Sequence, residues 1–386
     1  MKCLEIFTGA GGLAMAMGRA GFTHSAVVEY DHDACETMRH NKSMAGSPID
    51  GWPIIESDVR LILDYAATFK GVQVVAGGPP CQPFSMGGKA HGAKDPRDMF
   101  PEAVRAVRQL QPKAFVFENV KGLLREAFSD YFEYVILQMT YPSASRRTDE
   151  TAAAHRARLE RIHTQGTPPE YRVVWQLLNA ADYGVPQRRE RVFMVGFRSD
   201  LLLGWTFPAR THSKEALRHH KFGTGEYFER HKVVRRDRGA AHHSGTSISG
   251  SEYEKALTLQ PWRTVRDAIG DLPNPRSKPL PDLNHVFIDG ARSYPGHTGS
   301  PIDEPAKTLK AGDHGVPGGE NMLLLPDGRV RYFTLREAAR IQTFPDSYRF
   351  NRSWTESMRQ LGNAVPVALG EAVAKSVYRA LRGCNR

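Results

Sequence analysis

The chain has 386 residues, of which 40% are hydrophobic and 24% charged, so it is an ordinary globular sequence and not a disordered one. At about 100–200 residues per domain, this length predicts two or three domains. Fifty-two Lys and Arg against 42 Asp and Glu give a formal net charge of +10, which favours a polyanionic partner such as nucleic acid. Four scattered cysteines without a C-x-x-C pair argue against a disulfide framework and a structural zinc site. There is no signal-like segment and no run of the ~18 apolar residues that a membrane span needs, so we expect a soluble, cytoplasmic protein.

The first two hundred residues alternate between short apolar strands and helical segments. The expected strands are residues 4–7, 26–28, 72–76, 114–117, 172–178 and 191–197, and the expected helices are residues 13–19, 33–41 and 101–110. Strands that alternate with helices indicate βαβ units. The sequence therefore predicts an α/β fold with a mostly parallel, Rossmann-like sheet.

The alternation is lost from about residue 199 to residue 330, where Gly, Pro, His and Arg are frequent. We expect a second, smaller and irregular domain there. Residues 143–165 look like an exposed helical insertion, and helical periodicity returns at residues 334–343 and 367–381. The expected organisation is a catalytic domain at 1–198, the second domain at 199–330, a hinge region at 331–352 and a return to the catalytic domain at 353–386.

A glycine-rich turn, Phe7-Thr8-Gly9-Ala10-Gly11-Gly12, joins the first expected strand to the first helix. Glycines let a backbone approach a ligand at a helix N-terminus, although tight strand–helix packing would use the same residues. Glu29 ends the second strand, where a carboxylate can take both ribose hydroxyls of a nucleoside. Asp58 follows the third strand and could accept a hydrogen bond from an adenine amine. Either acid alone is more often a solvated loop residue, but together with the turn they favour a bound adenosine.

The sharpest feature is a cysteine that follows a strand, two glycines and two prolines, in the order Gly77-Gly78-Pro79-Pro80-Cys81. Prolines fix the backbone, so Cys81 is held in place. At the carboxyl edge of a parallel sheet, such a cysteine is positioned for nucleophilic attack, whereas a structural cysteine usually packs inside a strand or helix. Zinc deaminases also use Pro-Cys, but they need a second cysteine three positions on, where this chain has Phe84.

The sequence Gly-Pro-Pro-Cys-Gln-Pro-Phe-Ser from Gly78 to Ser85 resembles the signature of the C5-cytosine DNA methyltransferases. Other motifs of that family are present along the chain in the family's order. They are the Phe7 turn before the cysteine and, after it, Glu118-Asn119-Val120, Gln187-Arg188-Arg189-Glu190-Arg191, Arg336-Glu337-Ala338-Ala339-Arg340 and Gln360-Leu361-Gly362-Asn363-Ala364-Val365. Gly88, Gly92, Asp95 and Arg97 are similar to its loop after the cysteine. The chain is therefore identified as a member of this family, of the bacterial type.

The resemblance implies a nucleophilic role for Cys81, because cytosine C5 is too poor a nucleophile to take a methyl group directly. The thiolate would add to C6 and activate C5. Glu118 would hold or donate the proton at N3, and Arg191 would contact O2 of the base. Arg189 alternates with Arg191 along the expected strand, which predicts that both face the same side. A buried structural ion pair is the alternative interpretation of Glu118 with these arginines.

S-adenosylmethionine is the methyl donor that the resemblance implies. Phe7 would stack on the adenine, Glu29 would bind the ribose and Asp58 the adenine amine. The remaining candidate cofactor residues are Thr8, Gly9, Gly11, Gly12, Leu13, Val59, Pro80, Asn363 and Val365. The last two would close over the cofactor from the far end of the chain.

A cytosine inside a duplex is out of reach, so the enzyme must extrude the nucleotide. Residues 85–98 are rich in glycine and basic groups, which suits a loop that closes over a phosphate backbone. The candidate DNA contacts are Ser85, Lys89, Arg97 and Gln187. The irregular domain takes the place of the family's target-recognition region, and residues 307–320 could enter the major groove. Its paired histidines favour a solvated basic loop over a metal site.

The expected function is that of a monomeric DNA (cytosine-5-)-methyltransferase, with a separate restriction endonuclease as a possible partner. Two alternatives stay open. One branch of the family methylates transfer RNA with a similar Pro-Pro-Cys motif, and the same scaffold could also serve a catalytically silent DNA-binding protein. An NAD-dependent oxidoreductase is disfavoured because G-x-G-x-x-G is missing from the glycine turn.

Overall fold

The structure, a computed structural model, describes residues 1–80, 98–234, 238, 250–295, 297–311 and 321–384. Contacts divide the chain into two units. The first unit comprises Met1–Leu178, Glu190–Pro208 and Gly370–Arg386, and the second comprises Asn179–Arg189 and Ala209–Leu369. The domain boundaries expected at residues 198, 330 and 352 stay a prediction.

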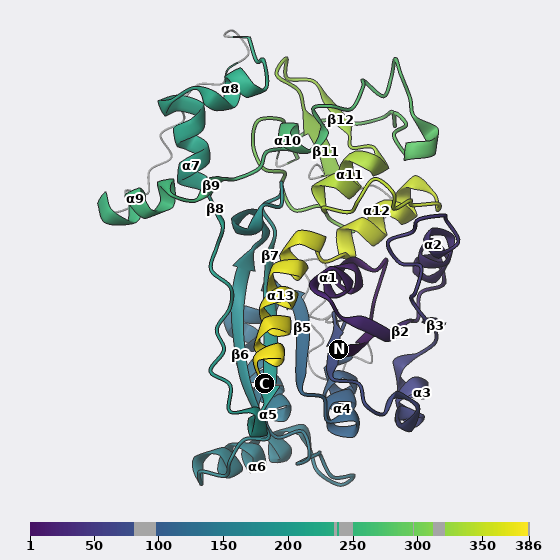
Figure 1. Cartoon of the computed structure of the whole chain (residues 1–386), viewed down its shortest axis with the longest axis vertical. Helices are drawn as coiled ribbons and strands as arrows, with labels where there is room; N and C mark the ends of the chain where they lie inside the picture. Colours follow the sequence, from purple (N-terminus) through teal and green to yellow (C-terminus); the bar gives the residue numbers. More distant parts are fainter. Residues whose placement is uncertain (81–97, 235–237, 239–249, 296, 312–320, 385–386) are drawn as a thin grey trace. The chain divides into compact units, whose positions relative to one another are not determined.

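The first unit is built on a seven-stranded sheet with the order β3-β2-β1-β4-β5-β7-β6 (Figure 1). The strands are β1 (Lys2–Ile6), β2 (Thr23–Glu29), β3 (Ile54–Glu56), β4 (Val74–Gly77), β5 (Ala114–Val120), β6 (Tyr171–Asn179) and β7 (Glu190–Arg198). The pairs β1–β2, β1–β4, β2–β3 and β4–β5 are parallel, whereas β5 and β7 are antiparallel. The predicted α/β fold with a mostly parallel sheet is therefore confirmed. Since parallel strands end at the same edge, the residues after β1, β2, β3 and β4 share that edge.

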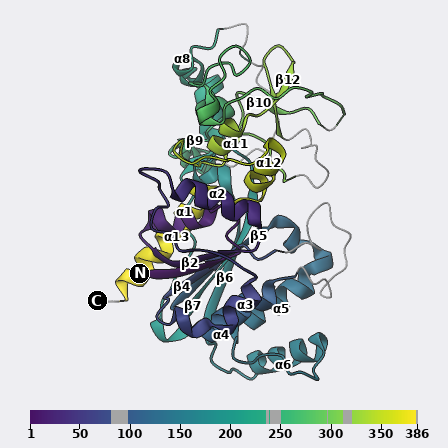
Figure 2. The ribbon, with the colours of Figure 1, turned by 90° about the vertical axis from the view of Figure 1, so that its right-hand side faces the viewer.

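Helices cover both faces of this sheet. They are α1 (Gly12–Ala20), α2 (His32–Lys42), α3 (Val59–Asp64), α4 (Phe100–Leu110), α5 (Ser129–Thr140) and, from Gly370 onward, α13 (Val367–Gly383). Helix α6 (Ala152–Thr164) packs against α5 and not against the sheet. Helices α1 and α13 lie on one face, and α4 and α5 lie on the other (Figure 2). On the α4 side, buried residues of the strands such as Ile6 and Phe115 pack with Phe100 and Val104 of α4 in one apolar cluster. This core fixes the strand ends that carry the site.

Every strand expected from the sequence overlaps an observed one, but the direction of β7 was not predicted. An apolar run indicates a buried strand without indicating whether it runs parallel or antiparallel to its neighbour. The β5–β7 register joins Ala114 to Phe197 and Val120 to Arg191. As a result, the amino end of β7 lies beside the carboxyl end of β5, where the parallel strands also end.

The second unit consists of short elements, as the loss of alternation indicated. Its helices are α7 (Lys214–Arg218), α8 (Glu226–Arg230), α9 (Gly250–Leu257), α10 (Val265–Ile269), α11 (Leu335–Ile341) and α12 (Trp354–Asn363). Its strands are β8 (His212–Ser213), β9 (Gln260–Pro261), β10 (Ser300–Pro301), β11 (Met322–Leu324) and β12 (Val330–Tyr332), arranged as a pair β8-β9 and a three-stranded sheet β10-β11-β12. In the described ranges of the whole chain, no helix combines the length and the apolar character needed to cross a bilayer.

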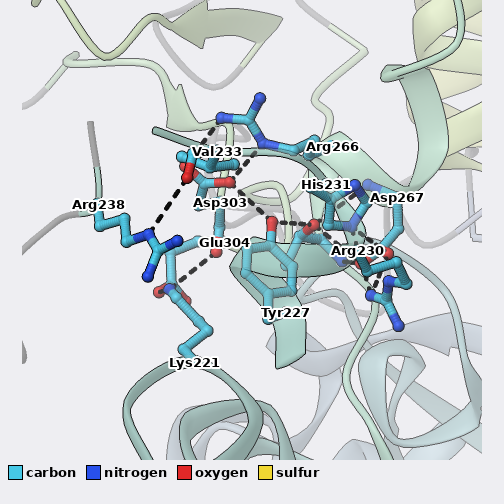
Figure 3. A network of polar contacts seen from close by, with 11 residues as sticks. Lys221, Tyr227, Arg230, His231, Val233, Arg238, Arg266, Asp267, Asp303 and Glu304 are labelled. Carbon is cyan, nitrogen blue, oxygen red and sulfur yellow. Dashed lines mark hydrogen bonds and ion pairs between the residues drawn. The ribbon is translucent and has the colours of Figure 1, made fainter. Parts of the chain in front are cut away.

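A polar network joins α8 and α10 within the second unit (Figure 3). The hydroxyl of Tyr227 donates to Asp303 at 2.8 Å and lies 2.9 Å from the hydroxyl of Thr264. Arg266 donates to both carboxylate oxygens of Asp303, at 2.6 and 3.0 Å. Thr264 and Asp267 form a reciprocal capping box at the start of α10. Because these buried and partly buried groups satisfy one another, the network can fix short elements that bury little apolar surface.

A buried acid–histidine pair joins β1 and β2 in the first unit. Glu5 is fully buried, and its carboxylate lies 3.9 Å from Nε2 of His24. The ring of Trp52 covers the imidazole, with the two centroids 4.9 Å apart. Burial raises the pKa of Glu5 well above its ordinary value, although the backbone amide of Ala14 opposes the rise. Burial also lowers the pKa of His24 to about 4, so both side chains are biased toward their neutral forms.

Replacing Glu5 by glutamine should make the stability of the fold less sensitive to a rise in pH above the ordinary carboxyl pKa. Because the pKa of Glu5 is higher in the folded than in the unfolded chain, stability falls as the pH rises from the unfolded toward the folded pKa. Glu5→Gln removes this loss, so its Tm should exceed that of the wild type by a margin that grows with pH. The margin should be roughly 2–4 °C for each kcal/mol of unfolding free energy that the wild type loses. Thermal unfolding at a series of pH values from the ordinary carboxyl pKa upward measures the margin. The exposed Glu126→Gln is the control, and a constant difference between Glu5→Gln and wild type at every pH would contradict the prediction.

Candidate active site

The turn between β1 and α1 has an unusual backbone. Phe7, Gly9 and Gly11 have φ values of 58°, 56° and 84°. The amide and the hydroxyl of Thr8 both donate to the carbonyl of Val28, at 3.2 and 3.1 Å, and so tie the turn to β2. A non-glycine residue in this region costs about 1–3 kcal/mol, and such strain is common at ligand sites. A side chain at Gly9 would meet no atom of the protein within 4 Å, so the backbone there borders open space.

Backbone amides hold the carboxylate of Glu29 at the end of β2. Its Oε2 accepts a hydrogen bond from the amide of Gly9 at 2.6 Å, and its Oε1 accepts from the amides of Tyr30 and Asp31 at 2.9 Å each. Burial raises the pKa of Glu29, and these amides oppose the rise. The structure therefore brings the glycine turn and this acid together, in an arrangement that suits the hydroxyls of a ribose.

Asp58 begins α3 as its capping residue. Its Oδ1 accepts from the amide of Arg60 at 2.8 Å, and Nε of Arg60 lies 3.0 Å from both carboxylate oxygens. This guanidinium lowers the pKa of Asp58, so the acid is an ionised acceptor near neutral pH. Val59, the next residue, is buried in the apolar core of the sheet. An adenine amine bound by Asp58 would share the carboxylate with Arg60.

A buried ion pair joins β5 and β7. Nε of Arg191 lies 2.7 Å from Oε1 of Glu118, and the two side chains are 11% and 9% exposed. Arg191 is paired with Val120, two residues from Glu118, which places both charged side chains on one face of the sheet. Burial lowers the pKa of Arg191, and Glu118 opposes the fall. A Cβ atom at Gly78 would lie 3.3 Å from Oε2 of Glu118, so the acid borders the segment that leads to Cys81.

Asn119 holds that segment. Its Nδ2 donates to the carbonyl of Pro79 at 3.0 Å, and the amide of Met99 donates to the carbonyl of Pro80 at 3.3 Å. No separate role was expected for Asn119, although an amide directly after the acid at a strand end was a usable signal. Four predicted residues lie outside the described residues: Cys81, Ser85, Lys89 and Arg97.

Two other predicted residues, Gln187 and Arg189, are fully buried within the second unit. The side chain of Gln187 bonds to the amide of Leu309, and Arg189 donates to the carbonyl of the same residue. Arg189 and Arg191 have different partners, because β7 begins at Glu190 and Arg189 precedes the strand. The alternation expected along one strand therefore does not extend to Arg189.

The other predicted cofactor residues differ in exposure. Asn363 ends α12 and is exposed, whereas Val365 is buried in the second unit. Gly12 and Leu13 are the first residues of α1, and both are buried. Their contacts with a cofactor stay predictions.

One group of possible metal ligands occurs among the described residues: His32, Glu36 and Glu56. Nδ1 of His32 lies 2.8 Å from Glu56, and the guanidinium of Arg39 lies 2.8 Å from Glu36 and also bonds to Glu56. Arg39 and His32 satisfy the two acids without an ion. A surface ion-pair cluster therefore accounts for this group.

Solved structures with a similar fold are methyltransferases. The chain is similar to the Dnmt2 methyltransferase of S. pombe, with a TM-score of 0.57, 17% identity and coverage of 100% of both chains. It is also similar to DNMT2 of Spodoptera frugiperda, with a TM-score of 0.56, 17% identity and coverage of 99% of both chains. The fold is thus that of an α/β methyltransferase.

Sequence comparison gives the family. The model described as C-5 cytosine-specific DNA methylase matches residues 1–141 and 152–379. The chain is 31% identical to the Type II methyltransferase M.NgoMIV of Neisseria gonorrhoeae over 390 residues, covering 99% of this chain and 98% of that protein. It is 29% identical to the Type II methyltransferase M.Sau96I of Staphylococcus aureus over 384 residues, covering 99% and 76%. The chain belongs to the C-5 cytosine-specific DNA methylase family, which confirms the predicted DNA (cytosine-5-)-methyltransferase.

Proposed function

We propose that this methyltransferase modifies C5 of a cytosine in a specific sequence of duplex DNA, as the protective enzyme of a restriction system. The observation that carries the proposal is the buried Glu118–Arg191 pair, which borders the segment leading directly to Cys81. The names of the relatives M.NgoMIV and M.Sau96I, both Type II methyltransferases, support the restriction context.

S-adenosylmethionine fits the glycine turn and would supply an electrophilic methyl group. The open space beside Gly9 lets a ligand approach the backbone, and the carboxylate of Glu29 can accept from ribose hydroxyls. Phe7 would stack on the adenine, and Asp58 would accept from its amine. The resemblance to the family assigns Asn363 and Val365 to the same ligand.

The chemistry begins with a bond between the Cys81 sulfur and C6 of the cytosine. This addition moves electron density into the ring, toward N3 and O2, and makes C5 nucleophilic. Glu118 holds a proton at N3, and Arg191 stabilises the charge that develops at O2. After C5 is methylated, water removes the C5 proton, and the electrons of that C–H bond re-form the C5–C6 double bond as the thiolate leaves C6.

The target nucleotide must leave the base stack before Cys81 can reach C6, which costs a few kcal/mol. We propose that Ser85, Lys89 and Arg97 contact the DNA at this stage. A positively charged, glycine-rich segment next to the nucleophile can neutralise phosphates and exclude water from the reaction.

The test compares nucleic acid substrates. Radiolabelled methyl incorporation is measured with purified protein on duplex DNA and on bulk transfer RNA, and bisulfite sequencing of plasmid DNA from expressing cells locates the modified cytosine. We expect incorporation into duplex DNA, always within one recurring sequence. Incorporation only into RNA would favour the transfer RNA alternative, and none into either substrate would favour a silent DNA-binding protein.

A further inference from the structure

A cavity of about 490 Å³ lies within the second unit, lined by α10, the loops that follow it and the strands β11 and β12. Its volume falls in the range of sites that bind small molecules. The described residues that line it include none of the candidate cofactor residues and none of the candidate DNA contacts named above. The cavity is therefore a feature that the methyltransferase site does not explain.

Apolar side chains supply part of the lining. They are Ile269, Leu272, Phe287, Ile302 and Leu323. Such walls favour a flat, apolar group over a hydrated ion, because the group loses its contact with water when it enters.

A guanidinium lies over the aromatic ring of this lining. The guanidinium carbon of Arg276 is 4.3 Å from the centroid of the Phe287 ring, and the Arg276 side chain is 69% exposed. Guanidinium planes and aromatic rings are the surfaces on which unpaired nucleobases stack in proteins. The side chain of Asn274 accepts a hydrogen bond from the amide of Arg276 at 3.0 Å through Oδ1, so its Nδ2 can donate to a ring acceptor.

Two other arginines of the lining are already paired with acids. Arg266 donates to both carboxylate oxygens of Asp303, at 2.6 and 3.0 Å (Figure 3). Arg331 donates to both carboxylate oxygens of Glu337, at 2.7 and 2.6 Å. All four side chains are at most 19% exposed. These pairs stay together when a ligand enters, because separating a buried pair leaves an uncompensated charge.

The remaining arginines of the lining, Arg276 and Arg329, have only exposed partners. Arg276 lies 3.7 Å from Asp289, and the two side chains are 69% and 88% exposed. Arg329 pairs with Asp327 two residues before it, where the side chains are 78% and 49% exposed. Ion pairs this exposed contribute little to stability. Both guanidiniums can therefore exchange their partners for the oxygens of a phosphate, which they bind through two parallel hydrogen bonds.

We propose that this cavity is a binding site for a free mononucleotide. The base stacks on the guanidinium of Arg276 beside Phe287, and the phosphate accepts hydrogen bonds from Arg329. A phosphate monoester carries nearly two negative charges and three acceptor oxygens, which matches two weakly paired guanidiniums better than the single charge of a phosphodiester in DNA. A base within a duplex must also be unstacked before it can enter, at a cost that a free nucleotide avoids.

The experiment measures the binding of deoxyguanosine monophosphate to the full chain by calorimetry. S-adenosylhomocysteine is present at saturation so that the nucleotide does not enter the candidate cofactor site, and guanine avoids the candidate cytosine site. Deoxyguanosine and inorganic phosphate are titrated separately. The nucleotide should bind at least about tenfold more tightly than either part, because only the nucleotide uses the ring surface and the guanidiniums together.

Three variants test the lining. Arg276→Gln and Arg329→Gln should each weaken binding of the nucleotide by about tenfold, and Phe287→Leu should weaken it by a smaller factor of about two to five. Arg218→Gln is the matched control, because it removes the same charge from an exposed residue of α7 outside the cavity and should keep the wild-type affinity. Circular dichroism checks the fold, and the two exposed arginine variants decide if Phe287→Leu does not fold.

Four results would overturn the proposal. They are no binding of the nucleotide to the wild type, wild-type affinity in folded Arg276→Gln and Arg329→Gln, an equal loss in Arg218→Gln, and binding of inorganic phosphate as tight as that of the nucleotide. Displacement of the nucleotide by a duplex of unrelated sequence would also contradict it, since the cavity would then belong to a DNA-binding surface. None of these measurements depends on methylation, so a failure of the proposed function is seen separately.

Discussion

Replacing Cys81 by serine is expected to abolish methyl transfer while DNA binding persists. A serine hydroxyl remains protonated near neutral pH, whereas a cysteine thiol provides a useful fraction of thiolate. Without the bond to C6, C5 of the cytosine does not become nucleophilic. The loss in kcat should be on the order of 10⁴-fold or more, as is found when an enzyme loses its nucleophile. Single-turnover methylation measures the loss, and a gel-shift titration measures DNA binding.

A covalent trap separates this role from a structural one. With 5-fluorocytosine at the target position, C5 carries fluorine in place of the proton that must leave, so the adduct persists. Wild type should give a denaturation-resistant protein–DNA band, and Cys81→Ser should give none. Cys384→Ser is the control, because Cys384 is a free cysteine that is partly exposed. The same band from Cys81→Ser, or undiminished methylation by that variant, would show that another group is the nucleophile.

The sequence was sufficient where a site is built from the ends of consecutive parallel strands. Glu29 follows β2 and the glycine turn follows β1, so a parallel sheet brings them together without further information. What the structure adds is the hydrogen bond from the amide of Gly9 to the carboxylate of Glu29, at 2.6 Å. The fold class was predictable for the same reason, since alternating strands and helices leave few arrangements of the chain.

The sequence was insufficient where partners lie far along the chain. Arg189 bonds to carbonyls 120 to 175 residues away, and no local pattern indicates such contacts. Alternation along a strand suggested that Arg189 faces the same side as Arg191, but the strand begins only at Glu190. The antiparallel direction of β7 was also hidden, although it determines that Arg191 lies across from Val120 and beside Glu118.

Glu118→Gln should cost about 10²–10⁴-fold in the rate of methyl transfer, because an amide cannot hold and release a proton at N3. If Glu118 and Arg191 form only a structural ion pair, Glu118→Gln should instead change the stability and leave the rate of methyl transfer unchanged. Arg191→Met leaves the carboxylate of Glu118 buried without its guanidinium, which should destabilise the fold by about 3–5 kcal/mol. Thermal unfolding and single-turnover methylation are therefore measured on the same variants.

The double variant Glu118→Gln/Arg191→Met separates the two interpretations. Because the uncompensated charge is gone, its stability should recover relative to Arg191→Met, whereas its rate should stay as low as that of Glu118→Gln. Glu190→Gln is the control, since Glu190 pairs with Lys121 at 2.8 Å where both side chains are exposed, and it should change neither quantity by much. If the double variant regains both the wild-type rate and the wild-type stability, the Glu118–Arg191 pair has only a structural role. A rate that stays low in a stable double variant would show that the pair acts in the reaction and not only in folding.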